Sequence, residues 1–234
     1  METQLGAGYL ETASAPAPVV GGPAVGRDVS GVLMPGISRG LTAIASLLLV
    51  GLFLVPLWRV QLVAPQYPEG LGMRIGINYI TGATPTDLRN INGLNHYVGM
   101  KHITPDAIPE LRYMPWIVGG LILCGLTAAI VGRRKALTIW LGAFLLAGVA
   151  GLVDFWRWEY DYGHNIDFEH AIIKIPGMNY QPPLLGVKQL LNFTAVSWPD
   201  VGAWIALAAF GIGALALVIA IRTRVSSGSD ASSR

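Results

Sequence analysis

Four long apolar runs dominate the chain, and they alternate with segments in which polar residues return. The runs cover residues 39–58, 114–132, 137–155 and 201–221. Each is close to the roughly 20 residues that a helix, rising about 1.5 Å per residue, needs to cross the roughly 30 Å hydrocarbon core of a bilayer. The pattern therefore predicts an all-α integral membrane protein, a bundle of four transmembrane helices in contact with the lipid bilayer.

Basic residues predict how these helices are oriented, because Lys and Arg near a helix end resist translocation. They gather at one set of ends, as Arg39, Arg133, Arg134, Lys135, Arg222 and Arg224. This places the turn at 133–136 and the tails at 1–38 and 222–234 in the cytoplasm, and the protein in a bacterial inner membrane. The tail at 1–38 is rich in Ala, Pro and Gly without a sustained period, so we expect it to be disordered.

The two segments predicted to be periplasmic, 59–113 and 156–200, are too long to be simple connections. We expect them to pack together as a small cap of mixed α/β or irregular structure. Residues 73–79 alternate like a half-buried strand, and Thr84 followed by Pro85 predicts the start of a short helix. The second segment is expected to begin as a helical continuation of the third span.

Composition and motifs exclude several classes of function. The chain has 234 residues, of which 53% are hydrophobic and 13% charged, and a net charge of +2 is too small to indicate a nucleic-acid partner. The single cysteine, Cys124, lies in an apolar run, so a disulfide framework and a CxxC metal site are excluded within one chain. Nucleophile, zinc-protease and phosphate-loop motifs are absent from the sequence, which names no catalytic residue and favours a non-enzymatic role.

Histidine and methionine are concentrated in the two predicted periplasmic segments. All four histidines and three of the six methionines lie there: His96, His102, His164, His170, Met73, Met100 and Met178. Each of these methionines follows a glycine, which lets an ion or another chain approach the backbone closely. Thioether and imidazole together suit Cu(I) better than Mg, Ca or Mn and need no thiolate. The distribution therefore predicts copper, although the same residues could simply pack a cap or an interface.

The spacing of His96, Met100 and His102 does not decide whether their segment is helical or extended. His96 and Met100 share a face if their segment is helical, whereas Met100 and His102 share one if it is extended. Asp161 could orient His164, as an outer carboxylate commonly orients a ligating imidazole. Alternatively, Asp161 belongs to a salt-linked helical extension with Asp154 and Arg157 at helical spacing.

Five strings in the two segments are distinctive: Ala64–Met73, Asn90–Met100, Trp158–His164, Pro176–Pro183 and Gly186–Phe193. Through these strings, roughly residues 62–200 resemble a bacterial four-span membrane family. Members of that family are similar to accessory proteins encoded beside the maturation genes of nitrous oxide reductase, a copper enzyme. The resemblance implies that Met73, His96, Met100, His164 and Met178 are metal ligands. It gives less support to His102 and His170, where the family's pattern often differs.

These observations lead to one main hypothesis and two alternatives. The main one is a membrane accessory protein whose periplasmic cap binds or passes copper, or docks a periplasmic or membrane copper-handling partner, during metalloenzyme maturation. The first alternative is a non-metal structural or interaction subunit of a membrane complex. The second, a catalytic oxidase subunit, would need a chromophore that nothing in the sequence requires.

Overall fold

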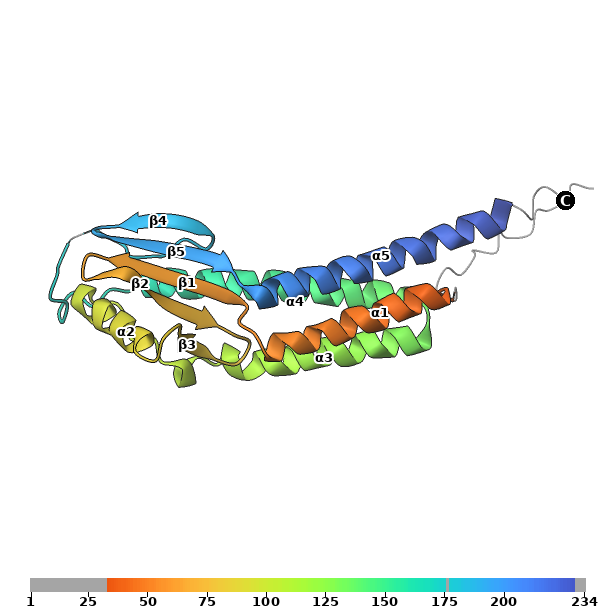
Figure 1. Cartoon of the computed structure of the whole chain (residues 1–234), viewed down its shortest axis with the longest axis horizontal. Helices are drawn as coiled ribbons and strands as arrows, with labels where there is room; N and C mark the ends of the chain where they lie inside the picture. The colour runs from red at the N-terminus through yellow and green to blue at the C-terminus, as the bar shows by residue number, and fades with distance from the viewer. Residues whose placement is uncertain (1–32, 176, 230–234) are drawn as a thin grey trace, which may run out of the picture.

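The computed structural model describes residues 33–175 and 177–229, and it has a helical bundle at one end and a β-sheet at the other (Figure 1). In the described residues, four helices are long and apolar enough to cross a membrane, which is consistent with a multi-pass membrane protein. They are α1 (Gly36–Leu48) with its 3-10 continuation η2 (Leu49–Phe53), α3 (Glu110–Val131), α4 (Arg134–His164) and α5 (Val201–Ser229). The four predicted apolar helices are therefore confirmed. The membrane that they cross and their orientation stay predictions.

The first helix is shorter than its apolar run. It ends at Phe53 and not at residue 58, because Pro56 has no backbone N–H with which to continue a helix and Trp58 already begins a strand. Residues 1–38 were predicted to be disordered, and 1–32 of them lie outside the described residues. Within 33–38, helix α1 begins at Gly36, so the predicted tail is not entirely without structure.

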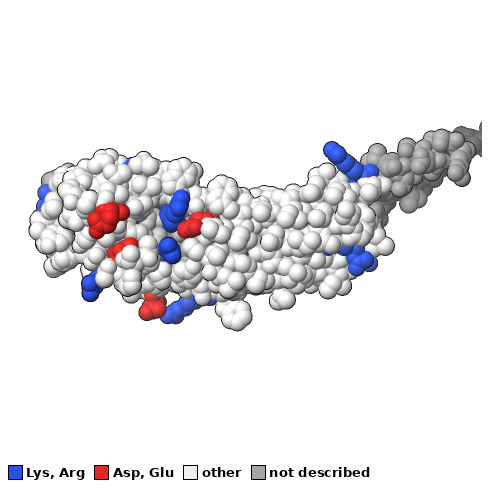
Figure 2. Space-filling view, in the orientation of Figure 1, with Lys and Arg blue, Asp and Glu red and all other residues white. Residues whose placement is uncertain are grey.

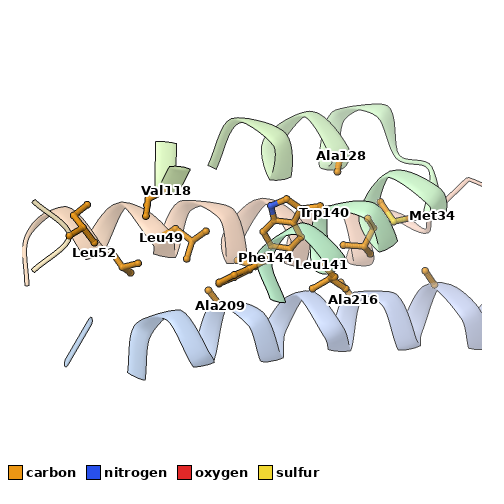
Figure 3. Packing of buried hydrophobic residues seen from close by; sticks show 14 residues of the cluster. Met34, Leu49, Leu52, Val118, Ala128, Trp140, Leu141, Phe144, Ala209 and Ala216 are labelled. Atoms are coloured by element: carbon orange, nitrogen blue, oxygen red, sulfur yellow. The ribbon is translucent and has the colours of Figure 1, made fainter. Parts of the chain in front are cut away.

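Helix α1 packs against both α3 and α5, and α4 closes the bundle through contacts with the same two helices. The core contains Leu49, Trp140, Phe144 and Ala209, which point toward one another between the helices (Figure 3). The Trp140 indole is buried, and its Nε1 donates a hydrogen bond to the Leu121 carbonyl oxygen at 2.8 Å. A buried indole N–H normally needs such a partner, so this bond helps to fix α4 against α3.

Figure 2 shows that charged side chains gather toward the two ends of the molecule. On the face shown, charged side chains lie over the sheet and at the far end of the bundle, where those visible are basic, and a band without charge separates them. The uncharged band has the character of a lipid-facing surface.

The sheet has five antiparallel strands in the order β3-β2-β1-β5-β4. Their bounds are β1 Trp58–Ala64, β2 Tyr67–Ile75, β3 Ile80–Gly82, β4 Gly186–Leu190 and β5 Phe193–Pro199. Strand β1 pairs with β5 along its length, from Trp58 opposite Pro199 to Val63 opposite Thr194. The two long segments therefore share one sheet and pack together, as predicted. The all-α fold class is correct only for the bundle.

One face of the sheet is covered by helix α2 (Asp87–Val98) and by the end of α4 (Figure 1). Helix α4 has 31 residues, and at about 1.5 Å per residue it is longer than the roughly 30 Å hydrocarbon core. Its last residues leave the bundle, and Phe155, Trp158 and Tyr162 pack on the sheet's core. The predicted helical continuation of the third span is thus confirmed. We call residues 57–109 and 156–200 the sheet domain.

Candidate functional site

The end of helix α2 positions the first candidate residues. Gly99 has a left-handed conformation, with φ of 78°, and ends the helix after Val98. His96 therefore lies on the last helical turn, while Met100 and His102 follow in chain that belongs to no helix or strand. Their side chains line a surface depression of about 210 Å³, together with Gly99, Lys101, Asp167 and His170. We call this the histidine depression.

Two imidazoles lie edge to face in the histidine depression. The ring centres of His96 and His102 are 6.2 Å apart, and the ring planes meet at 70°. Both side chains are exposed, whereas Met100 beside them is half-buried. Neither helical nor extended spacing alone describes this arrangement, because α2 ends at Val98 and the residues after Gly99 belong to no helix or strand.

The third imidazole, His170, is oriented by a carboxylate. Its Nδ1 lies 2.8 Å from Asp167 Oδ2, and this hydrogen bond holds the pKa of Asp167 below its ordinary value. The turn is tied to α2, since the Asp167 backbone N–H donates to the Gly99 carbonyl at 2.8 Å. With Nδ1 engaged, Nε2 of His170 is the ring atom that could bind a ligand, an arrangement common around metal-bound histidines.

The other three predicted ligands lie elsewhere. Met73, on β2, is buried in the core of the sheet domain. His164 stacks on Tyr160, with ring centres 3.9 Å apart, and its Nδ1 lies 3.0 Å from the Tyr160 carbonyl oxygen. Met178 is half-buried and does not line the histidine depression. The depression therefore joins His96 and Met100 to His102 and His170, the two histidines that the resemblance favoured less.

Within the described residues, Asp161 forms no hydrogen bond with the His164 imidazole. Its carboxylate accepts hydrogen bonds from the Lys101 ammonium, at 2.8 Å, and from the Asn165 side-chain amide. The bond from Lys101 is the main cause of a lowered Asp161 pKa. The hydrogen bonds of Asp161 thus go to Lys101 and Asn165, and its role in orienting His164 stays a prediction.

The histidine depression is open on one side. In the parts of the chain that the structure describes, no group of three or more His, Cys, Asp or Glu side chains is close enough to hold a metal ion. The depression thus presents three imidazoles and one thioether at a surface, without forming a closed coordination shell.

A second cavity, of about 60 Å³, lies inside the sheet domain between the sheet, α2 and α4. We call it the internal cavity. Its walls are almost entirely apolar, and both Met73 and Met100 line it. Tyr180 is held beside the cavity by its backbone N–H, which donates a hydrogen bond to the Gly163 carbonyl at 2.9 Å. Because Gly163 has no side chain, the segment that contains Tyr180 can lie close to α4 there.

Two residues that line the internal cavity carry polar groups with no hydrogen-bond partner within residues 33–175 and 177–229. Both carboxylate oxygens of Glu159 and the hydroxyl of Tyr180 are unpaired, and these residues are only 2% and 1% exposed. Burial raises the pKa of Glu159 to about 8. Sequence reasoning missed Glu159. The available signal was its helical spacing from Phe155 and Tyr162, which places an acid on the face of α4 that meets the sheet.

Comparison with known proteins finds no matching family model and no matching curated protein.

Proposed function

We propose that this protein is a multi-pass accessory protein of a bacterial inner membrane whose sheet domain lies in the periplasm and binds or passes copper, or docks a copper-handling partner, during metalloenzyme maturation. The observation that carries the proposal is the convergence of His96, Met100, His102 and His170 on one depression. These four residues come from two segments that are about 70 positions apart in sequence. Imidazole and thioether are the ligands that suit copper.

The geometry of the histidine pair supports this proposal. The ring centres of His96 and His102 are 6.2 Å apart, so a small adjustment of these exposed side chains would bring one nitrogen of each to a shared ion. His170 adds an imidazole whose orientation is fixed by Asp167. An open ligand set is suited to transfer, because a partner can supply or remove the ion without first unfolding a closed shell.

Copper binding by the detergent-purified full chain tests the proposal. A triple variant, His96→Ala with His102→Ala and His170→Ala, should lose one equivalent of bound Cu(I). The matched control is His164→Ala, which removes an exposed histidine outside the depression and should leave copper content unchanged. Equal copper in the triple variant and the wild type would overturn the proposal.

The proposed location has a separate test. Reporters that are active only outside the cytoplasm, fused after Thr84 or after Lys174, should be active, whereas a fusion at the turn 133–136 should not. Activity in the reverse pattern would place the sheet domain in the cytoplasm and remove the periplasmic role.

A non-metal interaction subunit is the second candidate, and a specific observation favours it. Large apolar side chains are exposed next to the histidine depression: Tyr97, Phe168, Ile172 and Ile173. Backbone N–H groups of Ile172 and Ile173 both bond to the Tyr97 carbonyl, so this apolar group is held together. If Ile172→Ser with Ile173→Ser abolishes the cellular function while the triple histidine variant retains it, the surface is a protein interface without a metal role.

A further inference from the structure

We propose that the internal cavity is a second site, for a Cu(I) ion, with Met73 and Met100 as sulfur ligands and Glu159 as the anionic partner, and that Met100 connects it to the histidine depression. This inference rests on the proposed copper function and deepens it. It assigns the exposed residues to capture of the ion and the buried ones to its retention.

The first observation is the position of Met100. Its side chain lines both the histidine depression and the internal cavity. It is half-buried, between exposed His96 and His102 on one side and buried Met73 on the other. A single flexible thioether therefore borders both spaces, so an ion could exchange imidazole for sulfur ligands without crossing the protein surface again.

The second observation is the unpaired Glu159 carboxylate. Buried polar groups are nearly always hydrogen-bonded, and burying an unpaired charge is costly. Within the described residues, the Glu159 carboxylate and the Tyr180 hydroxyl are both unpartnered, and both residues line the internal cavity. Without a cation, burial favours the protonated acid, which is neutral. A monovalent cation that takes the place of this proton beside the Glu159 carboxylate would also give a neutral pair in apolar surroundings, and would remove the cost that either charge would carry alone.

The lining identifies the class of ion. Of the residues that the structure describes, Met73, Met100 and Glu159 line the internal cavity, and no histidine or cysteine does. Mg, Ca and Mn take oxygen ligands, whereas thioethers select Cu(I). A volume of about 60 Å³ exceeds the roughly 10–15 Å³ that one water molecule requires. There is room for one ion with a water ligand, or for a few water molecules alone, and the experiment below distinguishes these occupants.

The test is anaerobic titration of the detergent-purified full chain with Cu(I), delivered from a chromogenic chelator complex of known affinity. Met73→Leu removes the buried sulfur at nearly constant volume, and Glu159→Gln removes the charge while keeping the shape. Met34→Leu is the matched control, because Met34 is equally buried but belongs to the bundle core. Thermal midpoints of all variants report whether each one folds.

We expect two equivalents of Cu(I) in the wild type and in Met34→Leu, and one in Met73→Leu. Glu159→Gln should bind its second equivalent at least ten-fold more weakly. The triple histidine variant should keep the internal equivalent. If Met73→Leu and Glu159→Gln both bind copper like the wild type, the internal cavity holds only water and the proposal is overturned while the proposed function survives. A wild type that binds no copper would overturn both.

Discussion

Lys101 and Asp161 form an ion pair across the surface of the sheet domain, with Nζ 2.8 Å from Oδ2. The pair ties the chain that follows α2 to the end of α4. Lys101 also lines the histidine depression, so Asp161 offsets a positive charge that would otherwise repel a metal cation.

Asp161→Asn should therefore weaken Cu(I) binding at the histidine depression by about two- to five-fold at low salt, the range expected of an exposed charge pair. The effect should shrink at high salt, because exposed charges are screened. Titration at two ionic strengths measures it. Asp106→Asn, an exposed acid outside the depression, is the control. An unchanged affinity at low salt would show that the pair is purely structural.

Glu159 predicts an unusual dependence of stability on pH. Its pKa is about 8 in the folded protein, against an ordinary value of 4.5, so the folded state favours the protonated acid. The contribution of protonated Glu159 to the free energy of unfolding is fully present below about pH 4.5. It falls as the pH rises toward 8, by roughly 3 kcal/mol between pH 5 and 8. Thermal unfolding of the metal-free chain across this range measures the loss. Glu159→Gln should flatten this part of the profile, and a variant as pH-sensitive as the wild type would refute the assignment.

Asp87 joins three parts of the sheet domain. Its Oδ2 accepts hydrogen bonds from the backbone N–H groups of Gly72, at 2.9 Å, and Thr84, at 3.2 Å, and its Oδ1 accepts one from the Thr84 hydroxyl. Burial alone would raise the pKa of Asp87, but these bonds outweigh it and lower the pKa. Asp87→Asn should destabilise the fold by about 1–3 kcal/mol. Chemical denaturation measures this change, and a loss no larger than that of Asp106→Asn would contradict it.

Gly125, which is buried in α3, lies close to side chains of α1 and α4 in the bundle core. A Cβ placed there would meet Ser46 Oγ and, at 2.7 Å, the indole of Trp140. Gly125→Ala should therefore cost about 1–3 kcal/mol through overpacking. Gly120→Ala, in the same helix with nothing within 4 Å of its Cβ, is the matched control. Similar thermal midpoints for the two variants would disprove the close contact.

The bundle was predictable from sequence, because four apolar runs of spanning length leave few alternatives in a bilayer. The sheet was largely missed. Strands β1 and β5 are only 7 residues long each, and they adjoin apolar helical runs that mask their alternation. Their pairing joins residues about 140 positions apart, which local patterns do not encode. The predicted helix start was close, although Thr86, and not Thr84, is the N-cap of α2.

The candidate site was predicted in part. The concentration of histidine and methionine in two segments identified the region, and His96 with Met100 proved to be neighbours. His170 could be placed only after folding, because the hydrogen bond between Asp167 and Gly99 brings the second segment to the first. Glu159 was missed because the sheet that buries this face of α4 was itself missed, so its helical spacing from Phe155 and Tyr162 carried no meaning in the sequence alone.

X-ray absorption at the copper edge, on the Cu(I)-loaded full chain and on its triple histidine variant, tests the proposed copper chemistry most directly. We expect imidazole and sulfur scattering in the wild type, and loss of the imidazole component alone in the variant. A wild-type spectrum without imidazole, or one that the three substitutions leave unchanged, would contradict the proposed copper site.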